Sequence, residues 1–111
     1  MLACWLAALL TLLLAGCGGG DGSITIKTDG MRFVADEVRV KAGQPVTLHV
    51  VNRDGFAHAF DIDEFDIHAP LPAKVAYDAV FTPTEPGRYR FYCGSPGHEA
   101  AGMEGVLVVE P

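Results

Sequence analysis

The sequence predicts an all-β protein, folded as a Greek-key β-sandwich of about seven to eight strands. From residue 24 onward there is no long apolar stripe with a period of about 3.6 residues, and short runs alternate between apolar and polar residues instead. Gly, Pro, Asp and Asn separate these runs at short intervals, as turns require. With 111 residues the chain has room for one domain.

The alternation places the strands in order along the chain. Turn residues occupy the connections at 41–45, 52–55 and 84–87, which bound the runs on either side. We expect strands at residues 23–28, 37–41, 45–52, 58–62, 74–82, 87–93 and 105–110, with a further candidate at 31–34.

The period of two also predicts which side chains face the core. In the strand at 45–52, Val46, Leu48 and Val50 share one face and His49 lies on the other. In the strand at 87–93, Cys93 is the last position on the face that we expect to be buried. Its thiol would therefore lie in the packed core.

The N-terminal segment is typical of an exported lipoprotein. Residues 2–15 form an apolar run that only Thr11 interrupts, too short to span a bilayer but suited to a secretory signal. The run ends in Leu14-Ala15-Gly16-Cys17, which resembles the lipobox of bacterial lipoproteins. We expect a signal peptide at 1–16, followed at 17–22 by lipidated Cys17 and a Gly-rich linker. The lipid would anchor the protein to a bacterial membrane on its periplasmic or extracytoplasmic side. A plain signal peptide and an N-terminal membrane helix are the alternatives.

Cysteine usage leaves one thiol in the mature domain at 23–111. Cys4 leaves with the signal and Cys17 takes the lipid, so Cys93 has no disulfide partner. A free thiol in an oxidising compartment is a liability unless it is buried or occupied. Metal ligation would occupy it.

The formal net charge of -6 falls in the mature part, because residues 1–16 contain no Asp, Glu, Lys or Arg. An acidic domain argues against nucleic acid as a partner and permits docking with a basic protein. The densest charge cluster is the acidic run at 61–66. We interpret it as a solvated edge, with docking of a basic cytochrome as the alternative.

One loop brings together a thiol, an imidazole and a thioether, from Cys93, His98 and Met103 in the spacing C-x4-H-x4-M. A mononuclear electron-transfer copper binds one Cys thiolate and two His nitrogens in a trigonal set, with a weak Met sulfur on the axis. His58, at an expected junction of turn and strand, can supply the second imidazole. These residues therefore predict a copper site.

The segment Cys93-Gly94-Ser95-Pro96-Gly97-His98, followed by Met103, resembles the copper loop of the cupredoxins, in particular those of the rusticyanin, azurin and sulfocyanin type. The resemblance covers residues 23–111. It implies one copper ion (Cu+/Cu2+) per chain, with His58, Cys93 and His98 as equatorial ligands and Met103 as the axial ligand.

The chain departs from the family pattern beside the first histidine. Many cupredoxins carry Asn there, which ties the two ligand loops together and donates toward the thiolate. Here Ala57 and Ala59 flank His58, so we expect that hydrogen bond to be missing and the reduction potential to be affected. Of the other histidines, we expect His49 on the surface and His68 in solvent, with His68 as the substitute ligand should His58 point elsewhere.

These features predict a membrane-tethered type 1 copper protein that carries single electrons and is not an enzyme. A copper oxidase or nitrite reductase needs further His clusters, and this chain has four His in all. A binuclear purple centre requires two cysteines in the loop. The alternative is a copper chaperone or accessory protein that delivers or buffers copper for an oxidase. We expect a monomer whose partner is a redox protein such as a cytochrome or an oxidase.

Overall fold

The computed structural model describes residues 22–111, so the predicted signal peptide, Cys17 and most of the linker lie outside the described residues. The described residues are all-β, as predicted, with nine strands and one short 3₁₀-helix. The elements are β1 (Ser23–Thr28), β2 (Phe33–Val34), β3 (Glu37–Lys41), β4 (Val46–Val51), β5 (His58–Ile62), η1 (Asp63–Phe65), β6 (Ile67–Leu71), β7 (Ala76–Phe81), β8 (Gly87–Tyr92) and β9 (Glu104–Glu110).

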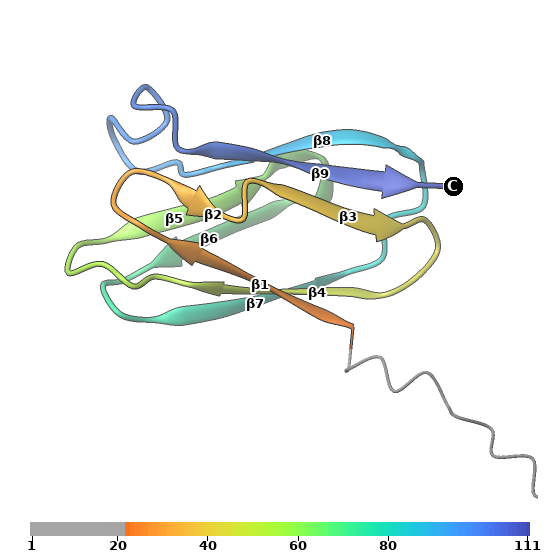
Figure 1. The fold of residues 1–111 in the computed structure, drawn as a ribbon, viewed down its shortest axis with the longest axis horizontal. Coiled ribbons are helices and arrows are strands. Elements are labelled where there is room, and N and C mark those ends of the chain that lie inside the picture. Colours follow the sequence, from red (N-terminus) through yellow and green to blue (C-terminus); the bar gives the residue numbers. More distant parts are fainter. Residues whose placement is uncertain (1–21) are drawn as a thin grey trace, which may run out of the picture.

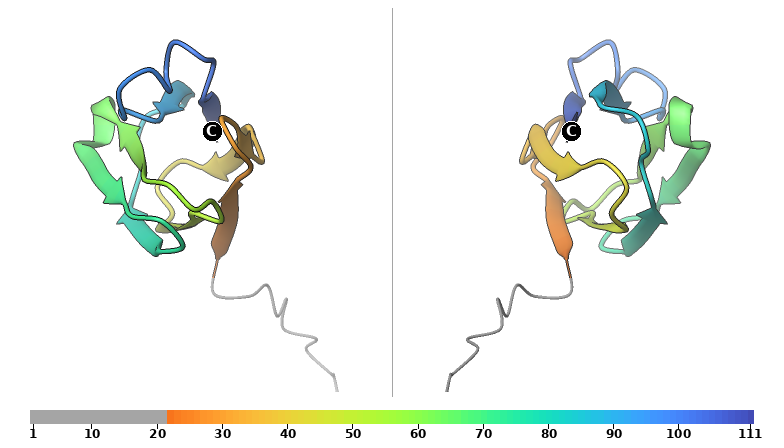
Figure 2. Two further views of the ribbon diagram at one scale, coloured as in Figure 1. Left: turned by 90° about the vertical axis from the view of Figure 1, so that its left-hand side faces the viewer. Right: turned by 90° about the vertical axis from the view of Figure 1, so that its right-hand side faces the viewer.

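The strands form two sheets, one with the order β2-β1-β4-β7 and the other with the order β3-β9-β8-β5-β6. The sheets face each other in Figure 1, and seen along the strands in Figure 2 they enclose a common interior. The chain crosses from one sheet to the other at five connections, β2 to β3, β3 to β4, β4 to β5, β6 to β7 and β7 to β8. Such crossings are typical of Greek-key sandwiches.

The predicted strands at 23–28, 37–41 and 58–62 have the observed bounds, and the other predicted strands differ by one or two residues at one or both ends. The prediction missed β6, whose burial alternates along the strand like that of a half-buried strand. Pro70 lies within it and removes a backbone donor. Because β6 is an edge strand, the sheet tolerates this loss.

The predicted inward faces are confirmed. In β4, Val46, Leu48 and Val50 are buried, while the residues between them are partly exposed. In β8, Phe91 is buried, and so is Cys93 immediately after the strand. The thiol therefore belongs to the hydrophobic core.

Three phenylalanines pack edge to face or tilted in the core and hold β5 and β8 in place. The ring centroids of Phe33 and Phe60 are 5.7 Å apart, and Phe91 lies 5.5 Å from each of them. Phe60 lies two residues after His58, and Phe91 two residues before Cys93. The cluster thus fixes β5 and β8 next to His58 and Cys93.

The chain enters the domain at the end opposite the 93–103 loop (Figure 1). Ser23 pairs with Thr47 in the parallel β1–β4 ladder, so it lies where β4 begins. The other end of β4 leads through the 52–57 turn to His58. Within residues 22–111, no helix is long and apolar enough to cross a membrane.

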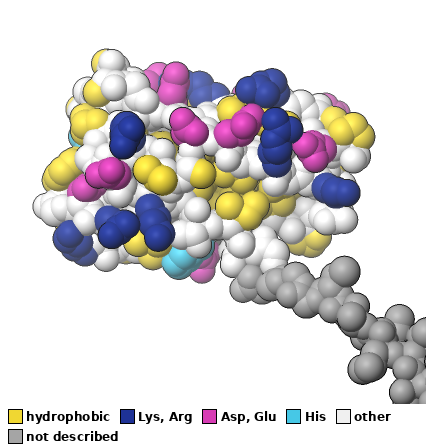
Figure 3. All heavy atoms as spheres, in the orientation of Figure 1, with side chains coloured by type: hydrophobic (Ala, Val, Ile, Leu, Met, Phe, Trp, Pro, Cys, Tyr) yellow, Lys and Arg dark blue, Asp and Glu magenta, His cyan; other side chains and the backbone are white. Residues whose placement is uncertain are grey.

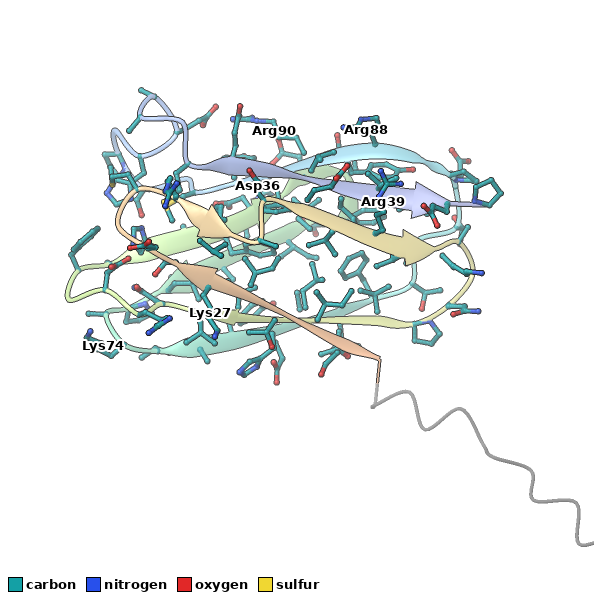
Figure 4. All side chains as sticks on the ribbon, in the orientation of Figure 1. Lys27, Asp36, Arg39, Lys74, Arg88 and Arg90 are labelled. Carbon is teal, nitrogen blue, oxygen red and sulfur yellow. The ribbon has the colours of Figure 1, made fainter. Side chains whose placement is uncertain are left out.

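Charged side chains of both signs are interspersed on the face seen in Figure 3. Arg39, Arg88 and Arg90 lie along β3 and β8 in Figure 4. Each has a guanidinium nitrogen between 2.7 and 3.9 Å from a glutamate oxygen. The positive charge of these three arginines is therefore locally neutralised.

Candidate metal centre

His58, Cys93 and His98 converge at one end of the sandwich. His58 is the first residue of β5, and Cys93 follows the last residue of β8. Because these strands are antiparallel neighbours, with Asp61 opposite Tyr92, the start of β5 lies beside the end of β8. His98 reaches the same place from the loop that follows.

The three side chains present their donor atoms to one point. Nδ1 of His58 and Nδ1 of His98 are 3.0 Å apart, and Sγ of Cys93 lies 3.8 Å from the first and 3.4 Å from the second. A circle through these atoms has a radius of about 2.0 Å, close to the bond lengths of about 2.0–2.3 Å that nitrogen and sulfur ligands form with zinc. Among the described residues, this is the group of His, Cys, Asp and Glu that could hold a metal ion.

The three residues differ in how far they are buried. Cys93 is 0% exposed and His58 is 2% exposed, whereas His98 keeps part of its surface accessible. The backbone N–H of Ala59 donates to Sγ of Cys93 over 3.2 Å. We expected the sulfur to lack a hydrogen-bond donor because alanines flank His58. That expectation is wrong, because the backbone N–H of Ala59 is the donor.

Backbone hydrogen bonds close the loop between Cys93 and Met103. The N–H of Cys93 donates to the carbonyl of Met103 over 3.0 Å, and the N–H of Met103 donates to the carbonyl of His98 over 3.1 Å. Gly97 and Gly102 take positive φ angles of 81° and 91°, which permit the tight path. Met103 is fully buried, with its backbone bonded to two of the converging residues.

Arg90 braces the loop from outside, at the position labelled in Figure 4. Its guanidinium donates to Glu99 over 2.8 Å and to Glu104 over 2.7 Å, and it lies 4.4 Å from the ring centroid of Tyr92. The hydroxyl of Tyr92 donates to Asp63, and this bond is the main reason that the pKa of Tyr92 is raised to about 12. Tyr92 is therefore neutral beside the loop at physiological pH.

A carboxylate supports His58 from behind. Nε2 of His58 lies 2.9 Å from Oδ2 of Asp54, and the N–H of Gly30 donates to Oδ1 over 3.1 Å. Burial acts to raise the pKa of Asp54, but hydrogen bonds from His58, Thr28 and Gly30 outweigh it and the pKa is lowered. The carboxylate is therefore the stable form.

A second carboxylate joins β5 to the loop that follows Cys93. Asp61 is 8% exposed; its Oδ2 accepts the N–H of Gly94 over 2.9 Å, and its Oδ1 lies 3.0 Å from Nδ1 of His68. The acidic run was predicted to be a solvated edge, and for Asp61 that prediction is wrong, because this carboxylate is buried against the residue after Cys93. The hydrogen bond with Asp61 is the main cause of a raised pKa at His68.

The structure thus brings together His58, Cys93 and His98, and it places His68 on Asp61 rather than in this group. Sequence reasoning missed Asp54 and Asp61. Asp54 precedes His58 by four residues but also fits the turn chemistry of 52–55, and Asp61 is hidden in a run of acidic residues. The role of Asp61 is revealed only by the approach of the distant segment at Gly94, and that of Asp54 only by the fold of the turn that sets it against His58.

A β-sandwich that gathers two imidazole nitrogens and a thiolate around one point has the donor set of a mononuclear copper protein. Residues 2–109 match the cupredoxin-like domain family, and the chain belongs to that family. It is 33% identical over 105 residues to the chloroplastic plastocyanin minor isoform of Arabidopsis thaliana, a match that covers 84% of this chain and 55% of that protein. The major isoform is 29% identical over 123 residues, covering 93% of this chain and 67% of the relative. The chain thus spans little more than half the length of the minor isoform.

Solved structures share the fold. Dithionite-reduced auracyanin from Roseiflexus castenholzii has a TM-score of 0.73 at 23% identity, covering 84% of this chain and 100% of that one. Auracyanin A, a "blue" copper protein from Chloroflexus aurantiacus, has a TM-score of 0.70 at 22% identity, covering 79% and 98%. The metal-binding domain of a Cu(I)-exporting P-type ATPase from Streptococcus pneumoniae has a TM-score of 0.71 at 20% identity, covering 83% and 90%.

Proposed function

We propose that this chain is a type 1 copper protein that carries single electrons, with His58, Cys93 and His98 as equatorial ligands and Met103 as the axial one. The observation that carries the proposal is the convergence of Sγ and two Nδ1 atoms around a point about 2.0 Å from each. A thiolate with two imidazoles and a weak thioether is the donor set of electron-transfer copper. Copper bound there would supply a one-electron couple, Cu+/Cu2+.

The surroundings of the donor atoms favour a site that changes little between oxidation states. Cys93 is anchored in the core and accepts the N–H of Ala59, and His58 is held by Asp54. Hydrogen-bonded neighbours of this kind orient the ligands and limit their movement. A rigid site suits repeated electron transfer better than metal delivery, which requires release.

Partial exposure of His98 supports an electron path from the site to a partner. His58 is buried, whereas His98 reaches the surface. The ring of Phe56, which is 46% exposed, lies 4.8 Å from the His58 ring and 5.9 Å from the His98 ring. A half-exposed aromatic ring beside a partly exposed imidazole suits close approach by another redox protein, such as a cytochrome or an oxidase.

Reconstitution with Cu(II) tests the proposal. We expect a strong thiolate-to-copper charge-transfer band that bleaches with one electron per chain and returns on oxidation. Weak d–d absorption alone would contradict type 1 ligation. The matched control is His49→Gln, which removes an imidazole on the exposed face of β4 and leaves the expected spectrum unchanged.

We also infer that lipidated Cys17 tethers the domain on the extracytoplasmic side of a membrane. The support is the lipobox-like Leu14-Ala15-Gly16-Cys17. The position of Ser23, at the end of the sandwich opposite the 93–103 loop, would leave the copper loop facing away from the anchor. The residues from Gly18 to Gly22 would reach roughly 12 Å as a flexible coil.

Cell fractionation tests the tether. Cys17→Ala is expected to move the protein from washed membranes to the soluble fraction, whereas Cys93→Ser is expected to leave it with the membranes. Membrane association of the Cys17→Ala protein after washing without detergent would show an uncleaved apolar segment instead.

A further inference from the structure

The ring nitrogen of His58 that points away from Cys93 contacts a carboxylate. Nε2 of His58 lies 2.9 Å from Oδ2 of Asp54, while Nδ1 of the same ring faces Nδ1 of His98 at 3.0 Å and Sγ of Cys93 at 3.8 Å. The His58 side chain is 0% exposed and that of Asp54 is 19% exposed. The two ring nitrogens therefore have separate partners in a largely dry environment.

Asp54 is itself held on several sides. Its Oδ1 accepts the N–H of Gly30 over 3.1 Å, and its own N–H donates to Oδ1 of Asn52 over 3.0 Å. Asn52 is 1% exposed, and its Nδ2 donates to the carbonyls of Phe56 and Leu71 over 2.9 and 3.0 Å. These hydrogen bonds hold the Asp54 carboxylate in place within the turn before β5.

We propose that Asp54 is a positioning residue that sets the tautomer of His58 and lowers the reduction potential of the copper site. This inference rests on the proposed function. A neutral imidazole carries one ring proton, and a carboxylate at Nε2 keeps the proton there. Nδ1 then presents its lone pair to the position shared with Cys93 and His98.

The effect on the potential follows from charge. A carboxylate hydrogen-bonded to a ligand imidazole makes the ligand more basic and adds negative charge close to the metal. The oxidised ion carries one more positive charge than the reduced ion and gains more from both effects. Asp54 therefore favours Cu(II) over Cu(I), and its removal raises the potential.

The test compares Asp54→Asn with Asp78→Asn. Asp78 pairs with His49 on the exposed face of β4 and β7, so the control removes the same charge from a second Asp–His pair in the same fold. We expect Asp54→Asn to lower the ratio of Cu(II) to Cu(I) affinity by about tenfold, the scale found for partners of metal-bound histidines. For one electron this is a rise of about 59 mV. Asp78→Asn is expected to stay at the wild-type potential.

Nitrogen NMR of the copper-free protein supplies a second readout that does not need the metal. At a pH where the His58 imidazole is neutral, we expect wild type to carry its proton on Nε2. Asp54→Ala, which removes the acceptor altogether, is expected to yield a mixture of both tautomers. Asp78→Asn is expected to keep the wild-type tautomer at His58.

The outcomes separate this inference from the proposed function. An Asp54→Asn potential equal to that of Asp78→Asn, or an unchanged His58 tautomer in Asp54→Ala, would overturn the role of Asp54. Absence of the charge-transfer band in wild type would overturn type 1 ligation, and the tautomer measurement would still decide whether Asp54 orients His58. If Asp54→Ala does not fold, as thermal unfolding would show, tautomer measurement on Asp54→Asn replaces it. Gly30 and His58 bond to different oxygens of Asp54, and in Asn one of these two positions becomes an NH2 donor, so only one of the two partners keeps an acceptor.

Discussion

The peptide N–H of Ala59 lies 3.2 Å from Sγ of Cys93 and donates to it. This one bond joins β5, which carries His58, to the end of β8, which carries the thiol. A hydrogen bond to sulfur stabilises the thiolate form that binds metal. Because the donor is a backbone group, the bond does not depend on the side chain at position 59.

Replacement of Cys93 by Ser is expected to abolish the charge-transfer colour and leave the sandwich folded. The thiolate is the source of the band, and a serine hydroxyl can still accept the N–H of Ala59. Loss of a buried sulfur contact should cost only about 1–2 kcal/mol of unfolding free energy. Visible absorption after Cu(II) addition and circular dichroism check the two parts, and a strongly coloured Cys93→Ser protein would refute the ligand assignment.

Replacement of Met103 by Leu is expected to retain copper and colour and to raise the reduction potential. The axial thioether is a weak ligand that favours Cu(II) more than a hydrocarbon does. Met103 is fully buried in the core, where exchange of Met for Leu usually costs less than about 1.5 kcal/mol. Voltammetry measures the potential, and a competition assay measures Cu(I) affinity.

The same variant separates an electron carrier from a copper chaperone. In a chaperone Met103 would be a main Cu(I) ligand, so its loss would sharply weaken Cu(I) binding. In a carrier the equatorial residues supply most of the affinity, so Cu(I) binding would stay near wild type while the potential rises. Collapse of Cu(I) affinity in Met103→Leu would therefore favour copper delivery.

Replacement of Gly105 by Ala is expected to destabilise the fold beneath the site. Gly105 pairs with Phe91 across β8 and β9, and a Cβ at this position would overlap the Phe91 ring and lie 2.6 Å from the carbonyl oxygen of Asp36. Overpacking of this kind costs about 1–3 kcal/mol. Denaturant unfolding measures the loss, with Gly55→Ala as the control because a Cβ there meets nothing within 4 Å. Equal stability of the two variants would contradict this account.

The parts of the site that the sequence predicted are those encoded by local spacing. Cys93 and His98 lie in one short loop, and His58 starts a strand whose alternation is clear. Asp54 and Asp61 could not be predicted in this way, because the segments that hold these two carboxylates in place are distant in the sequence. Asp54 meets residue 30 and Asp61 meets residue 94, each more than twenty residues away along the chain.

The exposed imidazole of His68 is linked through Asp61 to the peptide that follows Cys93. Oδ1 of Asp61 lies 3.0 Å from Nδ1 of His68, and Oδ2 accepts the N–H of Gly94 over 2.9 Å. Asp63 and Asp66 also face the imidazole, at 4.0 and 3.7 Å. The hydrogen bond with Asp61 is the largest cause of a His68 pKa above its ordinary value of 6.5, and it outweighs the opposing effect of desolvation.

The reduction potential is therefore expected to fall as the pH rises through the pKa of His68. Below that pKa the imidazole is cationic, and positive charge near the site disfavours Cu(II) and raises the potential. Above it the charge is lost and the carboxylate of Asp61 is no longer neutralised. Because the His68 side chain is 49% exposed, solvent and salt screen the charge, and the change should stay below about tenfold in the Cu(II) to Cu(I) affinity ratio. Voltammetry between pH 6 and pH 9 should show this step in wild type and not in His68→Gln, whereas an identical step in both proteins would place the titrating group elsewhere.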